Sequence, residues 1–145
     1  DYCPVSPGSS LIEAPSIGPK TAKRFEKIGI RTIGQFINEN PDELESKLAT
    51  RWITATLIAD WQDQTRLVYE VPALSGYRAQ LLVAVGCRTA WQLRTSSATT
   101  LGAQLAQFCQ TSEGQQILHA AQDPSNEDVA AWIESARAHA RRKAA

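Results

Sequence analysis

The sequence has no excess of charge of either sign, no long apolar run and no recognisable leader. Its 145 residues contain 15 Lys plus Arg and 15 Asp plus Glu, so the formal net charge is zero. The net charge therefore gives no argument for binding to nucleic acid or to an anionic membrane. No apolar run approaches the ~20 residues of a membrane-spanning helix, and no signal-peptide pattern is present. We therefore expect no membrane association.

Cysteine and histidine are scarce and widely spaced. Cys3, Cys87 and Cys109 are odd in number and form no C-x-x-C pair, which argues against a disulfide framework and against a zinc site. His119 and His139 share no ligand spacing with any cysteine. We predict no metal site and no cofactor, and a reducing, cytoplasmic setting.

Catalytic patterns are also lacking. No Ser/His/Asp or Cys/His set has a spacing that suits nucleophilic catalysis. The stretch "SIGPKT" superficially resembles a phosphate-binding loop, but Pro19 separates its Gly from its Lys and no strand precedes it. We interpret the clustered acids as helix caps and solvated helix faces, and we expect a protein that is not an enzyme. These acids are Asp42, Glu43, Glu45, Asp60 and Asp63.

What the chain does contain is an internal repeat. A shift of 57 positions aligns its two halves without gaps from Pro15 and Pro72 onward. Under a larger shift Trp61 pairs with Trp132, which an insertion around residues 111–124 explains. We predict a flexible segment over 1–8, a first unit over 9–70 and a second unit over 71–145. The identical pairs are Pro15/Pro72, Ala22/Ala79, Gly29/Gly86, Arg31/Arg88, Thr32/Thr89 and Gln35/Gln92.

Helix signals dominate both units. Residues 21–28 form a predicted helix that ends at Gly29, where a left-handed residue belongs. Thr32 can cap residues 33–39, and Asn40 before a proline and two acids indicates another helix start. The strand-like run "RLVYEV" is interpreted as a helix end. The predicted fold is all-α, with two tandem units and no significant sheet.

Longer helices are predicted at the end of each unit. Four apolar residues after position 52 are spaced for one buried stripe, and Asn126 is the predicted cap of a final helix. The tryptophans are interpreted as anchors of helix packing and not as exposed platforms for nucleic-acid bases. The stripe comprises Ile53, Leu57, Trp61 and Val68, and the tryptophans are Trp52, Trp61, Trp91 and Trp132.

The stretch "PSIGPKTAKRFEKIGI" at Pro15–Ile30 returns as "PALSGYRAQLLVAVGC" at Pro72–Cys87. Residues 15–36 closely resemble the helix-hairpin-helix motif, and residues 72–93 resemble it loosely. Two such units in tandem, each ending in a Trp-bearing helix, resemble an uncharacterised bacterial family of tandem helix-hairpin-helix repeats. The resemblance covers nearly the whole chain. Hairpins of this kind hold duplex DNA by its phosphates without reading sequence, and the resemblance therefore implies the same activity for this chain.

The first hairpin combines a turn suited to phosphate with a stripe of cations. A helix start exposes unpaired N–H groups and a partial positive charge, and a glycine turn lets a phosphate approach them. Four cations at i, i+3, i+4 and i+7 share one helix face, while Ala22, Phe25 and Ile28 should face the core. The alternative is a purely structural turn beside solvated cations. The predicted nucleic-acid-binding residues are Gly18, Pro19, Lys20, Thr21, Lys23, Arg24, Lys27 and Arg31.

The second hairpin has lost this stripe. Tyr77, Gln80, Leu81 and Ala84 stand where the first hairpin has its cations, which favours a packing surface between the units or a surface for another protein. Two hypotheses follow: a sequence-independent module for duplex DNA, or a protein-interaction module on the same scaffold. The chain begins with Asp rather than Met, which is consistent with a processed protein or a piece of a longer one. The secondary candidates for phosphate contact are Ser75, Gly76 and Arg78.

Overall fold

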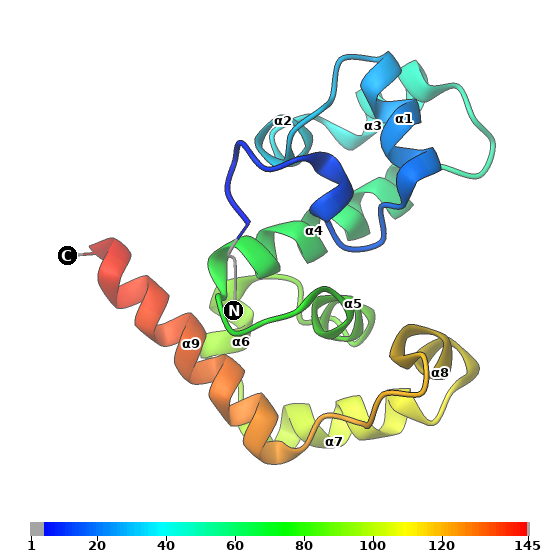
Figure 1. Cartoon of the computed structure of the whole chain (residues 1–145). Helices are drawn as coiled ribbons and strands as arrows, with labels where there is room; N and C mark the ends of the chain where they lie inside the picture. Colours follow the sequence, from blue (N-terminus) through cyan, green and yellow to red (C-terminus); the bar gives the residue numbers. More distant parts are fainter. Residues whose placement is uncertain (1–4, 145) are drawn as a thin grey trace.

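The computed structural model describes residues 5–144, and these form α-helices joined by short loops (Figure 1). Within this range no strand is present, and the only paired extended residues are Ser10 and Thr32, which form one isolated antiparallel bridge. The all-α prediction is confirmed. Cys3 and part of the predicted flexible segment 1–8 lie outside the described residues. In the part that is described, the Pro7 carbonyl accepts a hydrogen bond of 2.9 Å from the Gly34 amide.

Residues 5–70, called the N-terminal half below, contain four α-helices and begin with a short 3-10 helix. The helix starts follow from local side-chain chemistry, as the sequence predicts. Thr32 Oγ1 accepts a hydrogen bond of 3.2 Å from the Gln35 amide, and Asn40 Oδ1 accepts one of 2.8 Å from the Asp42 amide. Gly29 has a φ of 90°, the left-handed conformation expected of it. The elements are η1 (Leu11–Glu13), α1 (Pro19–Lys27), α2 (Ile33–Ile37), α3 (Pro41–Leu48) and α4 (Ala55–Glu70).

Residues 71–144, the C-terminal half, contain five helices. The bounds of α5 and of α6 each lie 57 residues after the bounds of α1 and α2, and Gly86 has a φ of 91°. Residues 111–124, where the sequence analysis predicts an insertion, contain the helix α8. The predicted cap Asn126 is wrong by one residue, because Ser125 Oγ accepts the hydrogen bond of 3.0 Å from the Asp128 amide. The elements are α5 (Gly76–Ala84), α6 (Ala90–Arg94), α7 (Ala98–Cys109), α8 (Ser112–Leu118) and α9 (Asn126–Ala144).

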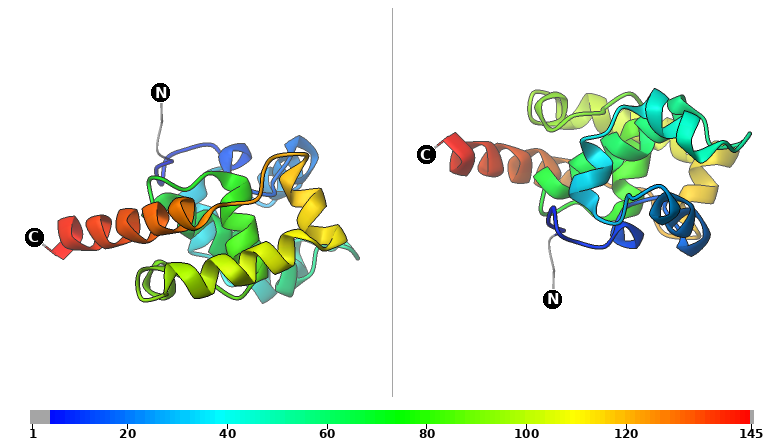
Figure 2. Two further views of the ribbon diagram at one scale, coloured as in Figure 1. Left: turned by 90° about the horizontal axis from the view of Figure 1, so that it is seen from below. Right: turned by 90° about the horizontal axis from the view of Figure 1, so that it is seen from above.

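Each half has its own apolar core, and α4 contributes to both. Ile58 is buried in the N-terminal core with Phe25 and Phe36, whose rings meet edge to face at 5.2 Å. Leu67 and the buried Trp132 belong to the C-terminal core. The helix α9 runs along the C-terminal half, and its end projects beyond the neighbouring helices (Figure 2).

The predicted buried stripe of α4 is only partly correct. Leu57 and Trp61 are half-buried, whereas Ile58 is fully buried. The inward face also carries Gln62, whose amide nitrogen donates hydrogen bonds of 2.9 Å to the carbonyls of Phe36 and Glu39. Because those bonds satisfy the N–H groups of its side-chain amide, a glutamine can occupy this buried position. The periodicity of apolar residues does not predict such a position.

In each half, an arginine of the last helix donates a hydrogen bond to a backbone carbonyl at the end of an earlier helix. Arg66 of α4 donates to the carbonyl of Ile37, at the end of α2. Arg137 of α9 donates from Nε to the carbonyl of Arg94, at the end of α6, over 3.1 Å. Each guanidinium therefore satisfies a carbonyl at a helix C-terminus, where the helix dipole favours a cation.

The junction between the halves is polar as well as apolar. Ser16 has a φ of 67°, and its hydroxyl donates to Gln64 Oε1 over 2.7 Å and accepts from Gln80 Nε2 over 2.8 Å. Arg88 pairs with Asp63 and Asp60 of α4 at 2.7 and 2.6 Å. These two acids, interpreted from the sequence as solvated, are instead engaged across the junction.

Candidate nucleic-acid interface

The start of α1 is open to solvent. Gly18 is the N-cap residue, with extended backbone (φ −87°, ψ 179°), and a Cβ built on it would meet nothing within 4 Å. Pro19 follows as the first helical residue and has no N–H to satisfy. Within residues 5–144 no acceptor is found for the amides of Lys20 or Thr21. The glycine is therefore not demanded by the backbone angle, and its effect is to leave these two amides without a side chain in front of them.

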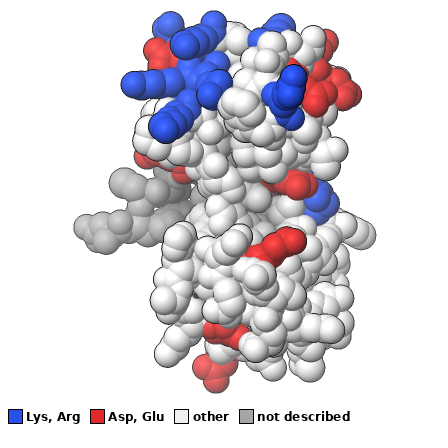
Figure 3. Space-filling model, turned by 90° about the vertical axis from the view of Figure 1, so that its right-hand side faces the viewer, with Lys and Arg blue, Asp and Glu red and all other residues white. Residues whose placement is uncertain are grey.

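The cation stripe lies on the solvent side of α1, as predicted. Lys20, Lys23 and Lys27 are exposed, Arg24 is half-buried, and Phe25 on the opposite face is fully buried. Arg31 is exposed in the following turn. In the part of the chain that the structure describes, none of these five cations lies within ion-pair distance of a carboxylate. Basic side chains gather over this end of the molecule (Figure 3).

One side of the stripe borders a shallow depression of about 490 Å³. Lys23, Lys27 and Arg31 line it together with one acid, Glu26. Three cations around one carboxylate give the depression a net positive charge. An anionic group such as a phosphate suits this lining better than a cation or an apolar ligand.

The other side of the stripe is flanked by Trp52. The sequence analysis interpreted this residue as a packing anchor, but its side chain is 63% exposed. The guanidinium carbon of Arg24 lies 4.9 Å from the centre of its ring, which is cation–π geometry. Trp52 occupies the loop between α3 and α4, where helical periodicity assigns no inward face. The position of Trp52 outside a predicted helix was therefore the feature of the sequence that could have indicated its exposure.

The start of α5, which lies 57 residues after the start of α1, is covered. A Cβ built on Gly76 would lie 3.7 Å from the side chain of Pro15, so the first half packs on the start of α5. The hydroxyl of Ser75 is buried and has no hydrogen-bond partner among the described residues. Leu81 is fully buried, which agrees with the expected packing role of this face.

Arg78, the cation among the secondary candidates, is also engaged. Its guanidinium carbon lies 5.6 Å from the ring centre of Trp132, and its Nε donates to the hydroxyl of Tyr77 over 3.2 Å. Arg88, the counterpart of Arg31, is held by its two ion pairs. The structure thus brings the first set of predicted residues together on an open surface, whereas Gly76 lies against Pro15 and Arg78 lies against Tyr77 and Trp132.

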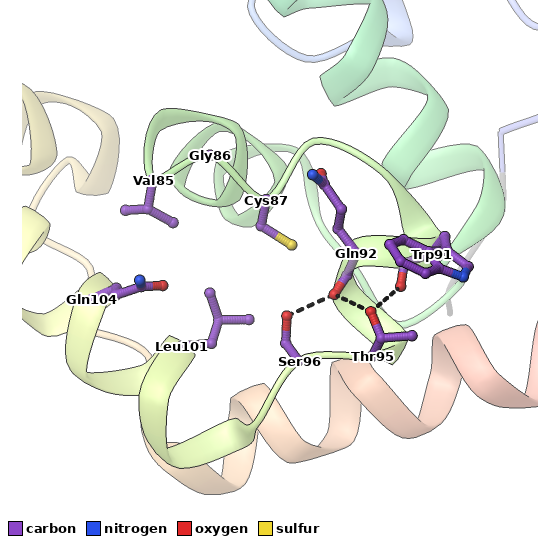
Figure 4. A pocket seen from close by; sticks show the side chains of 9 residues that line it. All are labelled: Val85, Gly86, Cys87, Trp91, Gln92, Thr95, Ser96, Leu101 and Gln104. Carbon is purple, nitrogen blue, oxygen red and sulfur yellow. Dashed lines mark hydrogen bonds between the residues drawn. The ribbon is translucent and has the colours of Figure 1, made fainter.

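Sequence reasoning also missed Trp91, which is 61% exposed although it was interpreted as an anchor. In the short helix α6 the neighbouring Ala90 and Leu93 face the core, so Trp91 points outward. It borders a depression of about 290 Å³ (Figure 4). The side chains that Figure 4 labels around it are Val85, Cys87, Gln92, Thr95, Ser96, Leu101 and Gln104, with Gly86 at the turn.

Charge is nearly absent around this second depression. Residues 95–122 contain one ionisable side chain of the Lys, Arg, Asp and Glu types, Glu113. A neighbouring and more apolar depression of about 360 Å³ shares Val85 and Gln104 and adds Phe108. The surface around α1 is therefore basic, with its cations gathered at one end of the molecule, whereas the surface around the second depression is nearly uncharged (Figure 3).

The fold and surface define an all-helical domain with one basic, open helix start. Residues 15–139 match the family described as "Domain of unknown function (DUF4332)", and the chain belongs to that family. No curated protein and no solved structure matches the chain. Among residues 5–144 no helix is long and apolar enough to cross a bilayer, and no cluster of His, Cys, Asp and Glu could hold a metal ion.

Proposed function

We propose that the chain is a non-enzymatic tandem helix-hairpin-helix domain that binds duplex DNA through its phosphates, without sequence preference, by the N-terminal half. The tandem arrangement is supported by the 57-residue offset that relates α1 to α5 and α2 to α6. The matching φ values of Gly29 and Gly86 and the matching arginine-to-carbonyl bonds of Arg66 and Arg137 support it independently.

One observation carries the DNA-binding proposal: among residues 5–144, amides without an acceptor at the start of α1 coincide with cations that form no ion pair with a carboxylate. The amides of Lys20 and Thr21 carry the partial positive charge of the helix end, and the lysine side chains are long enough to reach neighbouring phosphates. Contacts of this kind position a protein on the duplex but carry no base information. The binding is therefore expected to be independent of sequence.

The closed second hairpin limits the expected affinity. With one competent hairpin and about four cations at the phosphates, log K should fall with log salt at a slope of roughly −3.6. Raising the salt from 50 to 200 mM would then weaken binding by a factor on the order of 10². We expect detectable binding at low salt and weak binding at physiological salt.

The test is fluorescence anisotropy with a labelled blunt duplex at low salt. The wild-type chain is compared with the double variant Lys20→Glu/Lys23→Glu, which reverses two exposed cations of α1. The control is Arg142→Glu/Lys143→Glu, which makes the same change in net charge at the exposed end of α9. We expect the first variant to lose measurable binding and the control to retain most of it.

Two outcomes would contradict the proposal. If the wild-type chain does not bind the duplex at low salt, phosphate recognition at α1 is wrong. If both double variants weaken binding equally, the attraction is a property of total charge and not of the α1 surface. Two duplexes of unrelated sequence should give the same affinity, because only phosphates are contacted.

A second candidate function, protein interaction by the C-terminal half, rests on a different observation. Trp91 is exposed beside a depression whose rim includes Val85 and Leu101, within a nearly uncharged surface. Exposed tryptophan beside apolar side chains is typical of interface centres. Light scattering of the wild-type chain and of Trp91→Ser would test self-association as one form of this function. A strictly monomeric wild-type chain would exclude self-association through this surface.

A further inference from the structure

We propose that Trp52 is a stacking platform for an unpaired base, so that the α1 surface favours duplex DNA that carries a single-stranded extension. This inference deepens the proposed function and rests on it. It depends on three observations: the exposure of Trp52, its contact with Arg24, and its position at the edge of the cation stripe.

The indole is both exposed and oriented. An exposed fraction of 63% leaves much of the ring in contact with solvent, although tryptophan normally buries its large apolar surface. The guanidinium of Arg24 lies over the ring in a cation–π contact, with its central carbon 4.9 Å from the ring centre, and this contact orients the indole. A ring fixed in this way loses little conformational freedom when a ligand stacks on it. Exposure and fixed orientation together are what a stacking platform needs.

The position of Trp52 connects it with the phosphate site. Arg24 lies four residues after Lys20 and three before Lys27 on α1, so these cations are its neighbours on the helix surface. The loop that carries Trp52 reaches α1 through the contact of the indole with the Arg24 guanidinium. Arg51, next to Trp52 in the sequence, is also exposed. A strand whose phosphates lie on the stripe would therefore pass close to the ring.

The surrounding charge selects the kind of ligand. Within the described residues the cations of this surface have no acidic partner, so a polyanion is favoured over an ordinary protein surface. Inside a duplex the base faces are stacked against one another and cannot meet the indole, so a blunt duplex offers a face only at its two terminal pairs. An unpaired base has a free face, and aromatic side chains stack on such bases with little regard to their identity. The ligand class is thus DNA with a single-stranded part next to duplex.

The test compares two tryptophan variants of the full chain with two DNA probes. Trp52→Leu removes the platform, and Trp91→Leu is the matched control because its indole is similarly exposed, at 61%, but borders a depression with no charged residue in its lining. The probes are a blunt duplex and the same duplex with a single-stranded extension. We expect wild type and Trp91→Leu to bind the extended probe roughly five- to a hundredfold more tightly than the blunt one. In Trp52→Leu this preference should vanish while blunt-duplex affinity stays the same.

Quenching of intrinsic fluorescence gives a second readout that a merely structural role would not change. Addition of the extended probe should quench wild type and Trp91→Leu, and the quenching should be lost in Trp52→Leu. Trp52→Tyr keeps an aromatic face and should retain part of the preference, which guards against a folding defect in the leucine variant. The inference is overturned if Trp52→Leu keeps the preference, or if both leucine variants lose it equally. If blunt duplex is bound and only the preference is absent, the proposed function survives; if no probe is bound, both fail.

Discussion

Arg31 and Arg88 offer a sharp test, because they occupy equivalent positions but have different surroundings. Each backbone amide donates to the glutamine four residues later, at 2.8 Å for Arg31 and 2.7 Å for Arg88. The side chain of Arg88 is held by Asp60 and Asp63, whereas no acid pairs with Arg31 in the described part of the chain. We therefore predict that Arg88→Ala destabilises the fold and that Arg31→Ala does not.

The expected magnitude follows from the exposure of the network. The side chains of Arg88, Asp60 and Asp63 are 36%, 35% and 23% exposed, so solvent screens both ion pairs. Each pair of this kind contributes about 0.2–1 kcal/mol. Loss of both, with Asp60 left without a cation and Asp63 paired with Arg66 alone, should cost about 1–2 kcal/mol of unfolding free energy. For a chain of this length that corresponds to a fall in melting temperature of roughly 3–7 °C.

The assay is thermal unfolding followed by circular dichroism at low salt and at 1 M NaCl. Arg88→Ala should lower the midpoint at low salt and much less at high salt, because the screening length falls to about 3 Å. Arg31→Ala should change the midpoint by no more than about 1–2 °C. Equal effects of the two substitutions at low salt would refute the assignment of Arg88 to a stabilising junction.

Two further predictions concern the junction and the buried thiols. Ser16→Ala should lower the free energy of unfolding in urea by about 2 kcal/mol, because it removes two hydrogen bonds to glutamines. Ser16→Gly should lower this free energy by less, because glycine suits the φ of 67°. The explanation fails if the glycine variant is the less stable of the two. Burial raises the pKa of the Cys87 thiol to about 11 and raises that of Cys109. In a Cys3→Ser variant, Cys87 should therefore react with a thiol reagent near neutral pH on the order of 10² times more slowly in the native state than in urea, and Cys109 should also react more slowly. Rapid native labelling would be inconsistent with the burial of the two thiols.

The helix starts and ends could be predicted because local chemistry determines them. Thr32 with Gln35, Asn40 before a proline, and Gly29 after α1 act within a few residues of themselves. Their effects do not depend on what packs against the helix. For the same reason the cation stripe and the buried Phe25 were assigned to the correct faces of α1.

Which face of α4 is buried, and which tryptophans are exposed, depends on distant parts of the chain. The helix α4 contributes to two cores, so its inward face includes Ile58 and the hydrogen-bonded Gln62 and departs from a single apolar stripe. Trp52 stands in a loop, where no periodicity gives direction. Trp91 lies in a five-residue helix whose two inward positions are already filled by Ala90 and Leu93.

The difference between the starts of α1 and α5 also has a tertiary origin. The helix α5 follows α4, which supplies the acids for Arg88, and Pro15 covers the start of α5. The helix α1 is preceded, within residues 5–18, by no α-helix that could neutralise its cations. The predicted repeat alone would suggest equal surfaces, whereas the order of the elements leaves the start of α1 open and covers the start of α5.

The central claim is that the amides at the beginning of α1 meet a phosphate. The most direct measurement is a titration of the ¹⁵N-labelled chain with a short duplex at low salt, followed by amide NMR signals. We predict the largest shifts at Lys20 and Thr21 and small ones at Gly76 and Tyr77, where α5 begins under Pro15. Unchanged signals at Lys20 and Thr21, with shifts confined to α5 or to the end of α9, would contradict the account.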